Sequence, residues 1–180
     1  MDDIVIIGAG ECGTRAAFTL RSEGFDGRIR LIGAEAQLPY ERPPLSKPGT
    51  AGAVCRLIAD QAAFDEKRIE LRIGATAVRL DPEHKWALFA DGSKLSYDRL
   101  LLTTGASPRQ LTCPGQEFVH TFRTFNDAEW LCHRVHARSH CVVIGAGLIG
   151  LELAASLVER GARVTVIESS ARAMARAVPE

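Results

Sequence analysis

Residues 4–13 have the sequence IVIIGAGECG, and residues 141–150 have the closely similar sequence CVVIGAGLIG. Each stretch is an apolar run followed by Gly-x-Gly-x-x-Gly, and the second copy lies 137 residues after the first. The agreement continues through the pairs Ala17 and Ala154, Leu20 and Leu157, and Gly24 and Gly161, and then through the apolar runs Ile29–Ile32 and Val164–Ile167. A strand, a glycine turn, a helix and a second strand within about 30 residues form a βαβ unit, so the sequence predicts two such units.

Each glycine of the pattern has its own role when such a turn binds a dinucleotide. The first permits the tight turn, the second lets a pyrophosphate approach the backbone, and the third lets helix and strand pack closely. Unpaired N–H groups at the start of the helix then bind the phosphates. The glycines are Gly8, Gly10 and Gly13 in the first copy and Gly145, Gly147 and Gly150 in the second. A glycine turn can also simply connect a strand to a helix, but two copies in register favour two dinucleotide-binding sites.

An acidic residue follows the second strand of each copy. Glu168 comes directly after the run Val164–Ile167, at the position where a carboxylate accepts hydrogen bonds from a ribose 2′-OH and repels a 2′-phosphate. The second copy is therefore predicted to prefer NAD to NADP. The alternative is that Glu168 is an exposed acidic residue that merely ends a strand. Glu35 is the corresponding candidate in the first copy, although it comes one or two positions later, after Gly33 and Ala34.

The segment between the copies contains further helices and strands. The pattern predicts a helix over 59–68, strands over 69–73 and 76–80, an antiparallel hairpin of strands 85–90 and 94–97 joined by Asp91-Gly92, a buried parallel strand over 99–103, and a helix over 126–137. The predicted fold class is α/β, with two Rossmann-like dinucleotide-binding βαβ units and an antiparallel β insertion. Residues 1–120 are expected to form the first domain, and residues 121–180 the start of a second, incomplete domain.

Composition and charge exclude several kinds of protein. The 22 Lys and Arg residues balance 22 Asp and Glu residues, which leaves no positive field for nucleic acid. The N-terminus lacks the basic start and apolar run of a signal peptide, and glycines and Glu152 interrupt the apolar stretch 141–158. We therefore expect a cytoplasmic protein without a membrane segment.

The cysteines indicate reduced thiols. There are five of them, an odd number, and they contain no CxxC pair. The stretch from Cys132 to Cys141 also contains His133, His136 and His140, a spacing that could bind zinc. The favoured alternative is an exposed helix face of histidines followed by a cysteine in a buried strand, so no metal site is predicted.

Two dinucleotide sites in one chain suggest that a hydride passes between a nicotinamide and a flavin. The loop LPYERPPLSK at 38–47 follows the first unit and is stiffened by its prolines. It places Arg42 and Lys47 at fixed positions. On composition alone the simpler interpretation of this loop is a surface segment with two solvated cations.

With these residues in view, the chain resembles the FAD-dependent, NADH-linked ferredoxin reductases that serve aromatic-ring dioxygenases and bacterial P450 systems, within the two-dinucleotide flavoprotein oxidoreductases. The resemblance covers essentially the whole chain. It rests on the first glycine pattern, on the loop at 38–47, on YDRLLLTTGASPR at 97–109, on FRTFNDAEWL at 122–131, and on the stretch 142–168. Glutathione-reductase-like relatives have a redox-active cysteine pair after the first unit, and this sequence has none there, so the resemblance implies that flavin passes electrons directly to a ferredoxin-type iron–sulfur protein.

The resemblance also implies roles for individual residues. Lys47 would lie beside the isoalloxazine ring, supported by Arg42, and FAD would be contacted by Cys12, Val78, Thr104, Gly105, Arg123 and Arg109. Glu35 would substitute for the FAD-ribose acid that many relatives have at the position of Ala34. Leu148 and Ile149, inside the second glycine pattern, would contact NAD. No residue is expected to act as a general acid or base, because hydride and electron transfer depend on orientation and electrostatics.

Relatives in this family are more than twice as long as the chain. We therefore expect the sequence to be an N-terminal fragment of a complete reductase. The alternative is a truncated, non-catalytic dinucleotide-binding protein.

Overall fold

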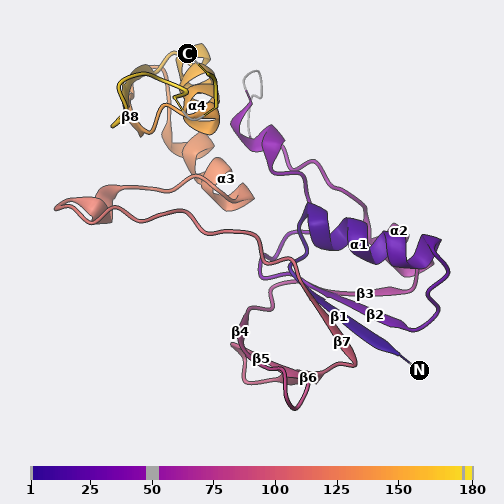
Figure 1. The fold of residues 1–180 in the computed structure, drawn as a ribbon. Helices are drawn as coiled ribbons and strands as arrows, with labels where there is room; N and C mark the ends of the chain where they lie inside the picture. Colours follow the sequence, from indigo (N-terminus) through magenta and orange to yellow (C-terminus); the bar gives the residue numbers. More distant parts are fainter. Residues whose placement is uncertain (1, 48–52, 176, 180) are drawn as a thin grey trace. The chain divides into compact units, whose positions relative to one another are not determined.

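The computed structural model describes residues 2–47, 53–175 and 177–179. The chain divides into two compact units (Figure 1). Unit 1 consists of the described residues of Met1–Glu41 and Arg56–Ser107, and unit 2 of those of Arg42–Cys55 and Pro108–Glu180. The assignment of residues 1–120 and 121–180 to two cofactor domains stays a prediction.

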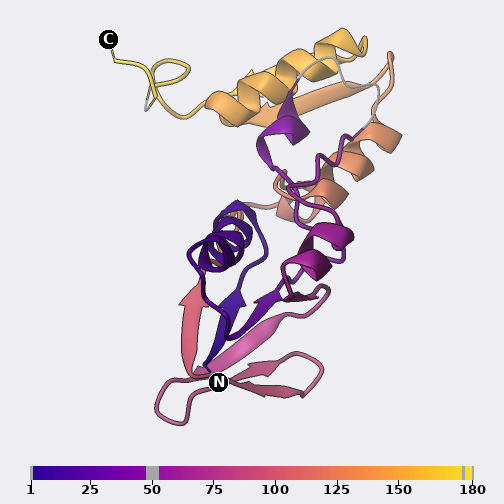
Figure 2. The same ribbon diagram turned by 90° about the vertical axis from the view of Figure 1, so that its right-hand side faces the viewer.

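Unit 1 is built on a parallel sheet with strand order β3-β2-β1-β7. The strands are β1 Asp3–Ile7, β2 Arg28–Ile32, β3 Ile69–Arg72 and β7 Arg99–Leu102. The helices α1 Glu11–Ser22 and α2 Gln61–Glu66 lie over one face of this sheet, and the antiparallel strands β4 Ala77–Asp81, β5 Trp86–Phe89 and β6 Lys94–Ser96 lie on the other (Figures 1 and 2). The parallel sheet and the antiparallel insertion confirm the predicted fold class.

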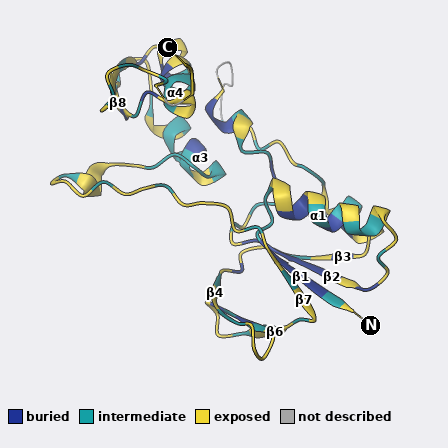
Figure 3. Cartoon of the chain, viewed as in Figure 1, coloured by how far each residue is buried: buried dark blue, intermediate teal, exposed yellow. Residues whose placement is uncertain are grey.

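Alternating side chains of β1 enter two separate cores, as the period of a strand requires. Ile4 and Ile6 pack on the helical side with Ala17 of α1 and Phe64 of α2. The neighbouring residues Val5 and Ile7 pack on the other side with Ala87 and Phe89 of β5. Figure 3 shows β1 and β2 as the most buried strands of the unit. Because the sheet is covered on both faces, the buried positions of its two central strands are apolar, with Arg30 of β2 as the exception.

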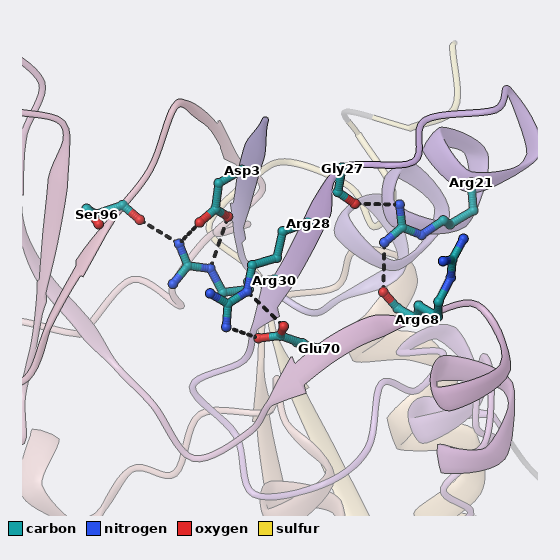
Figure 4. Close-up of polar contacts among 8 residues, drawn as sticks. All are labelled: Asp3, Arg21, Gly27, Arg28, Arg30, Arg68, Glu70 and Ser96. Carbon is teal, nitrogen blue, oxygen red and sulfur yellow. Dashed lines mark hydrogen bonds and ion pairs between the residues drawn. The ribbon is translucent and has the colours of Figure 1, made fainter. Parts of the chain in front are cut away.

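A polar network joins the starts of the strands (Figure 4). Arg30 projects from β2 toward the antiparallel sheet, where its guanidinium pairs with Asp3 and donates a hydrogen bond of 2.6 Å to the Ser96 carbonyl oxygen. Arg30 is 8% exposed, so this is a largely buried ion pair in which Nε and Nη2 of Arg30 have acceptors. Between β2 and the edge strand β3, Arg28 binds the Glu70 carboxylate through two hydrogen bonds of 2.8 Å.

Some predicted elements of unit 1 differ in detail. The helix predicted over 59–68 is the shorter α2, since Asp60 caps its start and Arg68 has a φ of +50° that ends it. The strand predicted over 99–103 is parallel as expected, but it is not buried: Leu101 is 38% and Leu102 is 53% exposed because β7 is an edge strand. The predicted turn at Asp91-Gly92 joins β5 to β6. The Gly92 N–H donates a hydrogen bond to the Phe89 carbonyl oxygen, and Gly92 itself has a φ of +81°. This is a type I turn followed by a left-handed glycine.

Unit 2 contains the second βαβ unit. Its elements are the 3-10 turns η1 Pro43–Ser46 and η2 Gln116–Phe118, the helices α3 Phe125–Arg134 and α4 Leu148–Glu159, and the parallel strands β8 His140–Ile144 and β9 Arg163–Ile167. A capping box formed by Thr124 and Asp127 starts α3, which ends at Arg134 and not at the predicted residue 137, because Val135 is already extended.

The small core of unit 2 lies on one side of its two strands. Val143 of β8 packs with Ala154 and Leu157 of α4, and Leu131 of α3 packs against them. The opposite face of the strands is open in the described structure: Val142, Ile144 and Ile167 are each more than half exposed (Figure 3). No helix in the described ranges is both long and apolar enough to cross a membrane.

Candidate functional site

The two glycine turns have the same local geometry. The first glycine of each has a positive φ, +116° at Gly8 and +106° at Gly145, which side chains rarely tolerate. A Cβ atom on the third glycine would lie 2.0 Å from the carbonyl oxygen of the first, both at Gly13 and at Gly150. The third glycine therefore lets the helix pack directly on the end of its strand.

The second glycine of each turn faces open space. Gly10 and Gly147 have no atom of the described structure within 4 Å of a built Cβ, apart from their own chain neighbours. Each is the N-cap residue of its helix, and neither helix receives a side-chain capping bond from a described residue. By contrast, Asp60 caps α2 and Thr124 caps α3. The free N–H groups of α1 and α4 are thus available to an anion, and the open glycine lets a phosphate group approach, so both turns fit the pyrophosphate of a dinucleotide.

In unit 1 the carboxyl ends of β1 and β7 meet at the glycine turn. Thr103 donates its hydroxyl to the Gly8 carbonyl oxygen at 2.8 Å and its N–H to the Ile7 carbonyl oxygen at 2.8 Å. The next two residues, Thr104 and Gly105, are exposed at this edge. The structure therefore brings Thr104 next to Gly8, while its contact with a cofactor stays a prediction. Sequence reasoning missed Thr103, whose hydroxyl fixes the turn from the neighbouring strand.

Cys12 lies in the first turn of α1, between the second and third glycines, and its side chain is exposed. Leu148 and Ile149 occupy the same part of α4 in unit 2 and are 58% and 54% exposed. These three residues thus lie beside the free helix N-termini. Large apolar side chains at such exposure are suited to contact a ligand or another part of a protein.

The acidic residues after the two second strands differ in position. Glu168 follows β9 directly, and its carboxylate accepts hydrogen bonds from the Ala146 N–H at 2.7 Å and the Ser170 N–H at 2.8 Å. The equivalent residue after β2 is Gly33, and a Cβ there would lie 2.9 Å from the Cβ of Ala9. Glu35 lies two residues further on and accepts a hydrogen bond of 2.5 Å from the Tyr40 hydroxyl. The first turn therefore has no room for a carboxylate where the second turn has Glu168.

The hydrogen bonds at Glu168 also affect its charge. The N–H groups of Ser170 and Ala146 stabilise the ionised carboxylate and lower the pKa of Glu168 to about 2. Glu168 is therefore a fixed anion at neutral pH, oriented by the glycine turn itself. A fixed carboxylate at this place can accept hydrogen bonds from a ribose and repel a phosphate.

Two predicted residues stand apart from the glycine turns. Val78 lies at an irregularity in the pairing of β4 with β5 and is 58% exposed. The preceding residues Gly74 and Ala75 donate their N–H groups to the carbonyl oxygens of Glu35 and Gly33, which links this part of the chain to the carboxyl end of β2. Arg109 is exposed after β7, and within the described ranges it has no hydrogen bond to another candidate residue.

The loop 42–47 packs within unit 2. Arg42 donates a hydrogen bond of 2.8 Å to the carbonyl oxygen of Arg123, which brings these two predicted residues together. At the other end of the loop, the Lys47 ammonium lies 3.5 Å from a carboxylate oxygen of Glu152 on α4. The Ser46 hydroxyl donates a hydrogen bond of 2.7 Å to the other oxygen of the same carboxylate. Hydrogen bonding by Ser46, and to a lesser degree the Lys47 charge, lowers the pKa of Glu152.

Sequence reasoning missed Ser46 and Glu152. A signal for Glu152 existed, since it is a single charged residue in the apolar stretch 141–158. The partner of that charge lies more than 100 residues away in the sequence, so the pairing could not be inferred from the pattern alone.

The described residues contain no group of three or more His, Cys, Asp or Glu side chains placed to hold a metal ion. All five cysteines lie in the described ranges and are free thiols.

The family profile of the pyridine nucleotide-disulphide oxidoreductases matches residues 2–180. The chain belongs to this family.

Among curated proteins the chain is 44% identical over 180 residues to rhodocoxin reductase of Rhodococcus erythropolis, covering 97% of this chain and 42% of that protein. It is 41% identical to the ferredoxin–NAD(+) reductase component of the p-cumate 2,3-dioxygenase system of Pseudomonas putida, covering 98% of this chain and 45% of that protein. Among solved structures, the ferredoxin reductase for the CYP199A2 system from Rhodopseudomonas palustris superposes with a TM-score of 0.91 at 40% identity, covering 99% of this chain and 45% of that one. The chain thus spans less than half the length of these relatives.

Proposed function

We propose that the protein to which this chain belongs is a flavoprotein oxidoreductase that transfers a hydride from NADH to FAD and then electrons to a ferredoxin-type iron–sulfur protein of an oxygenase system. The observation that supports this most directly is the pair of glycine turns, each with an open second glycine and an uncapped helix. Two dinucleotide sites in one protein suit transfer between a nicotinamide and a flavin. The activity belongs to the complete protein, since this chain spans less than half of its relatives.

We assign the first turn to FAD. The phosphates would bind the N–H groups of α1 beside Gly8, Gly10 and Gly13, with Cys12, Glu35, Val78, Thr104 and Gly105 around the rest of the cofactor. The exposed position of Thr104 and Gly105 beside the turn supports this arrangement. Glu35 lies two residues beyond the position that corresponds to Glu168, and its carboxylate accepts a hydrogen bond from the Tyr40 hydroxyl.

We assign the second turn to NAD. Its phosphates would bind at Gly145, Gly147 and Gly150, with Leu148 and Ile149 against the cofactor and Glu168 at the adenosine ribose. The fixed negative charge of Glu168 favours a free 2′-OH over a 2′-phosphate. Residues 1–120 would then be the N-terminal part of the FAD domain and residues 121–180 the start of the NAD domain.

Lys47 is the residue we propose beside the isoalloxazine ring, where a cation stabilises reduced flavin. Bound FAD supplies the redox chemistry, since it accepts a hydride and gives up single electrons. The chain's own contribution is to orient the cofactors and to place charge, through Lys47 and through Arg42, which is anchored on the backbone of Arg123. Arg123 and Arg109 are assigned to the FAD side as well.

The proposed electron acceptor is an iron–sulfur protein. The five thiols are free, and no cysteine pair follows the first βαβ unit, so an internal dithiol relay is not part of the proposal. One relative is named as a component of a dioxygenase system, and a structure of 34% identity is a putidaredoxin reductase–putidaredoxin complex. We further propose that the protein acts in the cytoplasm, where reducing conditions keep such thiols free.

Glu168→Arg tests the assignment of the second turn. The variant removes the ribose acceptor and adds a partner for a 2′-phosphate, so the ratio of kcat/KM for NADH to that for NADPH should fall by roughly 100-fold. Glu159→Arg, on an exposed part of α4, is the charge-matched control and should leave the ratio unchanged. An unaltered ratio in Glu168→Arg would remove Glu168 from the nucleotide site.

Lys47→Met tests the flavin assignment. Flavin reduction by saturating NADH should slow by roughly tenfold, because a cation near the developing negative charge is lost. Lys67→Met, in unit 1, is the control. A rate equal to that of the parent protein would show that Lys47 is a surface cation, as in the simpler interpretation.

The alternative of a non-catalytic nucleotide-binding protein predicts no flavin absorption and no NADH-dependent reduction of an artificial acceptor.

A further inference from the structure

Two consecutive residues bind the two oxygens of one carboxylate. The Ser46 hydroxyl is 2.7 Å from Oε2 of Glu152, and the Lys47 ammonium is 3.5 Å from Oε1. Ser46 and Lys47 come from the loop after the first βαβ unit, whereas Glu152 lies on the helix of the second. All three belong to unit 2.

The two contacts differ in strength. Lys47 has a flexible side chain that is 55% exposed, and its distance from Glu152 is long for an ion pair. A solvent-exposed pair of this kind contributes little stability, so the ion pair alone does not fix the position of the Glu152 carboxylate. Ser46 is 5% exposed, and its short bond to a charged acceptor is of the stronger, directional kind. The position of the carboxylate is therefore set by Ser46 and not by Lys47.

The surroundings also hold Ser46 in place. Ser46 ends the turn η1, whose Leu45 is 8% exposed and lines a small groove with Leu131 of α3 and Leu157 of α4. Arg42, the residue directly before that turn, donates a hydrogen bond to the Arg123 carbonyl oxygen. The Ser46 hydroxyl is thus presented from a packed turn, and it can orient Glu152 at a small cost in entropy.

We propose that Ser46 is a positioning residue, which fixes the Glu152 carboxylate so that this carboxylate holds the Lys47 ammonium in a defined place. We call this arrangement of Ser46, Glu152 and Lys47 the clamp, and it requires no cofactor. Its consequence for catalysis rests on the proposed function, in which Lys47 lies beside flavin.

The clamp can be tested without flavin, on the apoprotein of the complete chain. The pKa of Glu152 is measured by carboxyl ¹³C NMR, with Glu152→Gln to assign the signal. The groups that face Glu152 are the Ser46 hydroxyl and the Lys47 ammonium, and both stabilise its ionised form. Ser46→Ala should raise the pKa of Glu152 toward the ordinary glutamate value, and Ser46→Thr, which keeps a hydroxyl, should restore the low value. Ser156→Ala, on the same helix, should have no effect.

A second measurement connects the clamp to the chemistry. In the flavin-loaded protein, Ser46→Ala should slow flavin reduction at saturating NADH by roughly threefold to tenfold, with the Kd for NADH within about twofold of the parent value. Ser46→Thr should recover most of the rate. Far-UV circular dichroism and Trp130 fluorescence verify that the variants fold.

The outcomes separate the two proposals. If Ser46→Ala leaves the Glu152 pKa unchanged, or if Ser46→Thr fails to restore it, the clamp is wrong whatever the activity. If the pKa responds as expected but neither Ser46→Ala nor Lys47→Met alters flavin reduction, the clamp stands and the role of Lys47 beside flavin is wrong.

Discussion

The two βαβ units share a glycine turn but differ in what surrounds it. A Cβ on Gly8 would lie 2.1 Å from the Thr103 carbonyl oxygen, because β7 closes over the turn in unit 1. A Cβ on Gly145 would have no described neighbour within 4 Å beyond its own chain neighbours. The sheet of unit 1 is also covered on both faces, whereas the strands of unit 2 are covered on one. The backbone conformation of the turn is therefore determined by its own residues, whereas its burial depends on the neighbouring strand.

The strand starts show a second difference. In unit 1 Asp3 of β1 pairs with Arg30 of β2, largely shielded from solvent. The equivalent residues of unit 2 are His140 and Thr165, whose side chains are 2.9 Å apart and exposed. The same backbone thus holds a buried ion pair in one unit and a surface contact in the other.

The two tryptophans allow each unit to be followed separately. Trp86 lies on β5 in unit 1, and Trp130 lies on α3 in unit 2. Replacing either one by Phe leaves a single fluorescent reporter for the other unit. The free energies of unfolding in the predictions below are measured by urea denaturation in these two backgrounds.

The largest contrast is expected between Gly8→Ala and Gly145→Ala. Both impose a positive φ on alanine, which costs about 1–2 kcal/mol. At Gly8 the methyl group also collides with the backbone of Thr103, which adds about 2–3 kcal/mol, so unit 1 should lose about 3–5 kcal/mol and unit 2 about 1–2 kcal/mol. Equal losses in the two units would show that β7 does not constrain the first turn.

A smaller contrast is expected between Asp3→Asn and His140→Gln. The first change leaves the buried Arg30 guanidinium without its counter-charge and should destabilise unit 1 by about 3 kcal/mol. The second alters an exposed side chain and should change unit 2 by less than about 0.5 kcal/mol. Arg28→Gln, which removes an exposed ion pair on β2, the strand of Arg30, is the control for Asp3→Asn and should have little effect. A loss in Asp3→Asn no larger than in Arg28→Gln would contradict the burial argument.

The smallest effect concerns the pH dependence of unit 2. The pKa of Glu168 is about 2 in the folded protein and about 4.3 in an unfolded chain, so the ionised carboxylate stabilises the folded unit above pH 4–5. That contribution is lost as the pH falls from about 4.3 through the folded pKa near 2. Glu168→Gln should therefore be less stable than the parent at pH 6, and the difference should shrink toward pH 2, as reported by Trp130. The turn of unit 1 has Gly33 at the equivalent place, so the Trp86 signal should not respond to Glu168→Gln; a difference in unit 2 that is constant with pH would refute the assignment.

Much of the fold could be predicted from local pattern. The glycine turns, the two helices that follow them and the hairpin at Gly92 depend on residues close together in the sequence. Element ends were less accurate: the helix after Thr124 stops at Arg134 because the backbone turns extended at Val135, a change that residue type alone does not specify. The burial of β7 was also mispredicted, since an apolar strand at a sheet edge has the same sequence as one in the middle.

The candidate site was predictable to the same extent. The glycines and Glu168 follow from spacing, because the turn and the next strand lie within one βαβ unit. The Ser46–Glu152 bond, the Thr103 hydroxyl on Gly8 and the Arg42–Arg123 contact join residues 81 to 106 positions apart. No periodicity links such residues, so their pairing was open until the chain was folded.

The sequence by itself determined the α/β class, the two glycine turns and the negative charge placed after the second of them, because each depends on backbone freedom or charge within a short segment. Only the tertiary structure decided that β7 seals the first turn and that Gly33 leaves no room for a carboxylate there. It also decided that Ser46 and Lys47 share the carboxylate of Glu152. The physical reason is that these contacts depend on which distant segments the hydrophobic cores bring together, and that choice is made by packing over the whole unit.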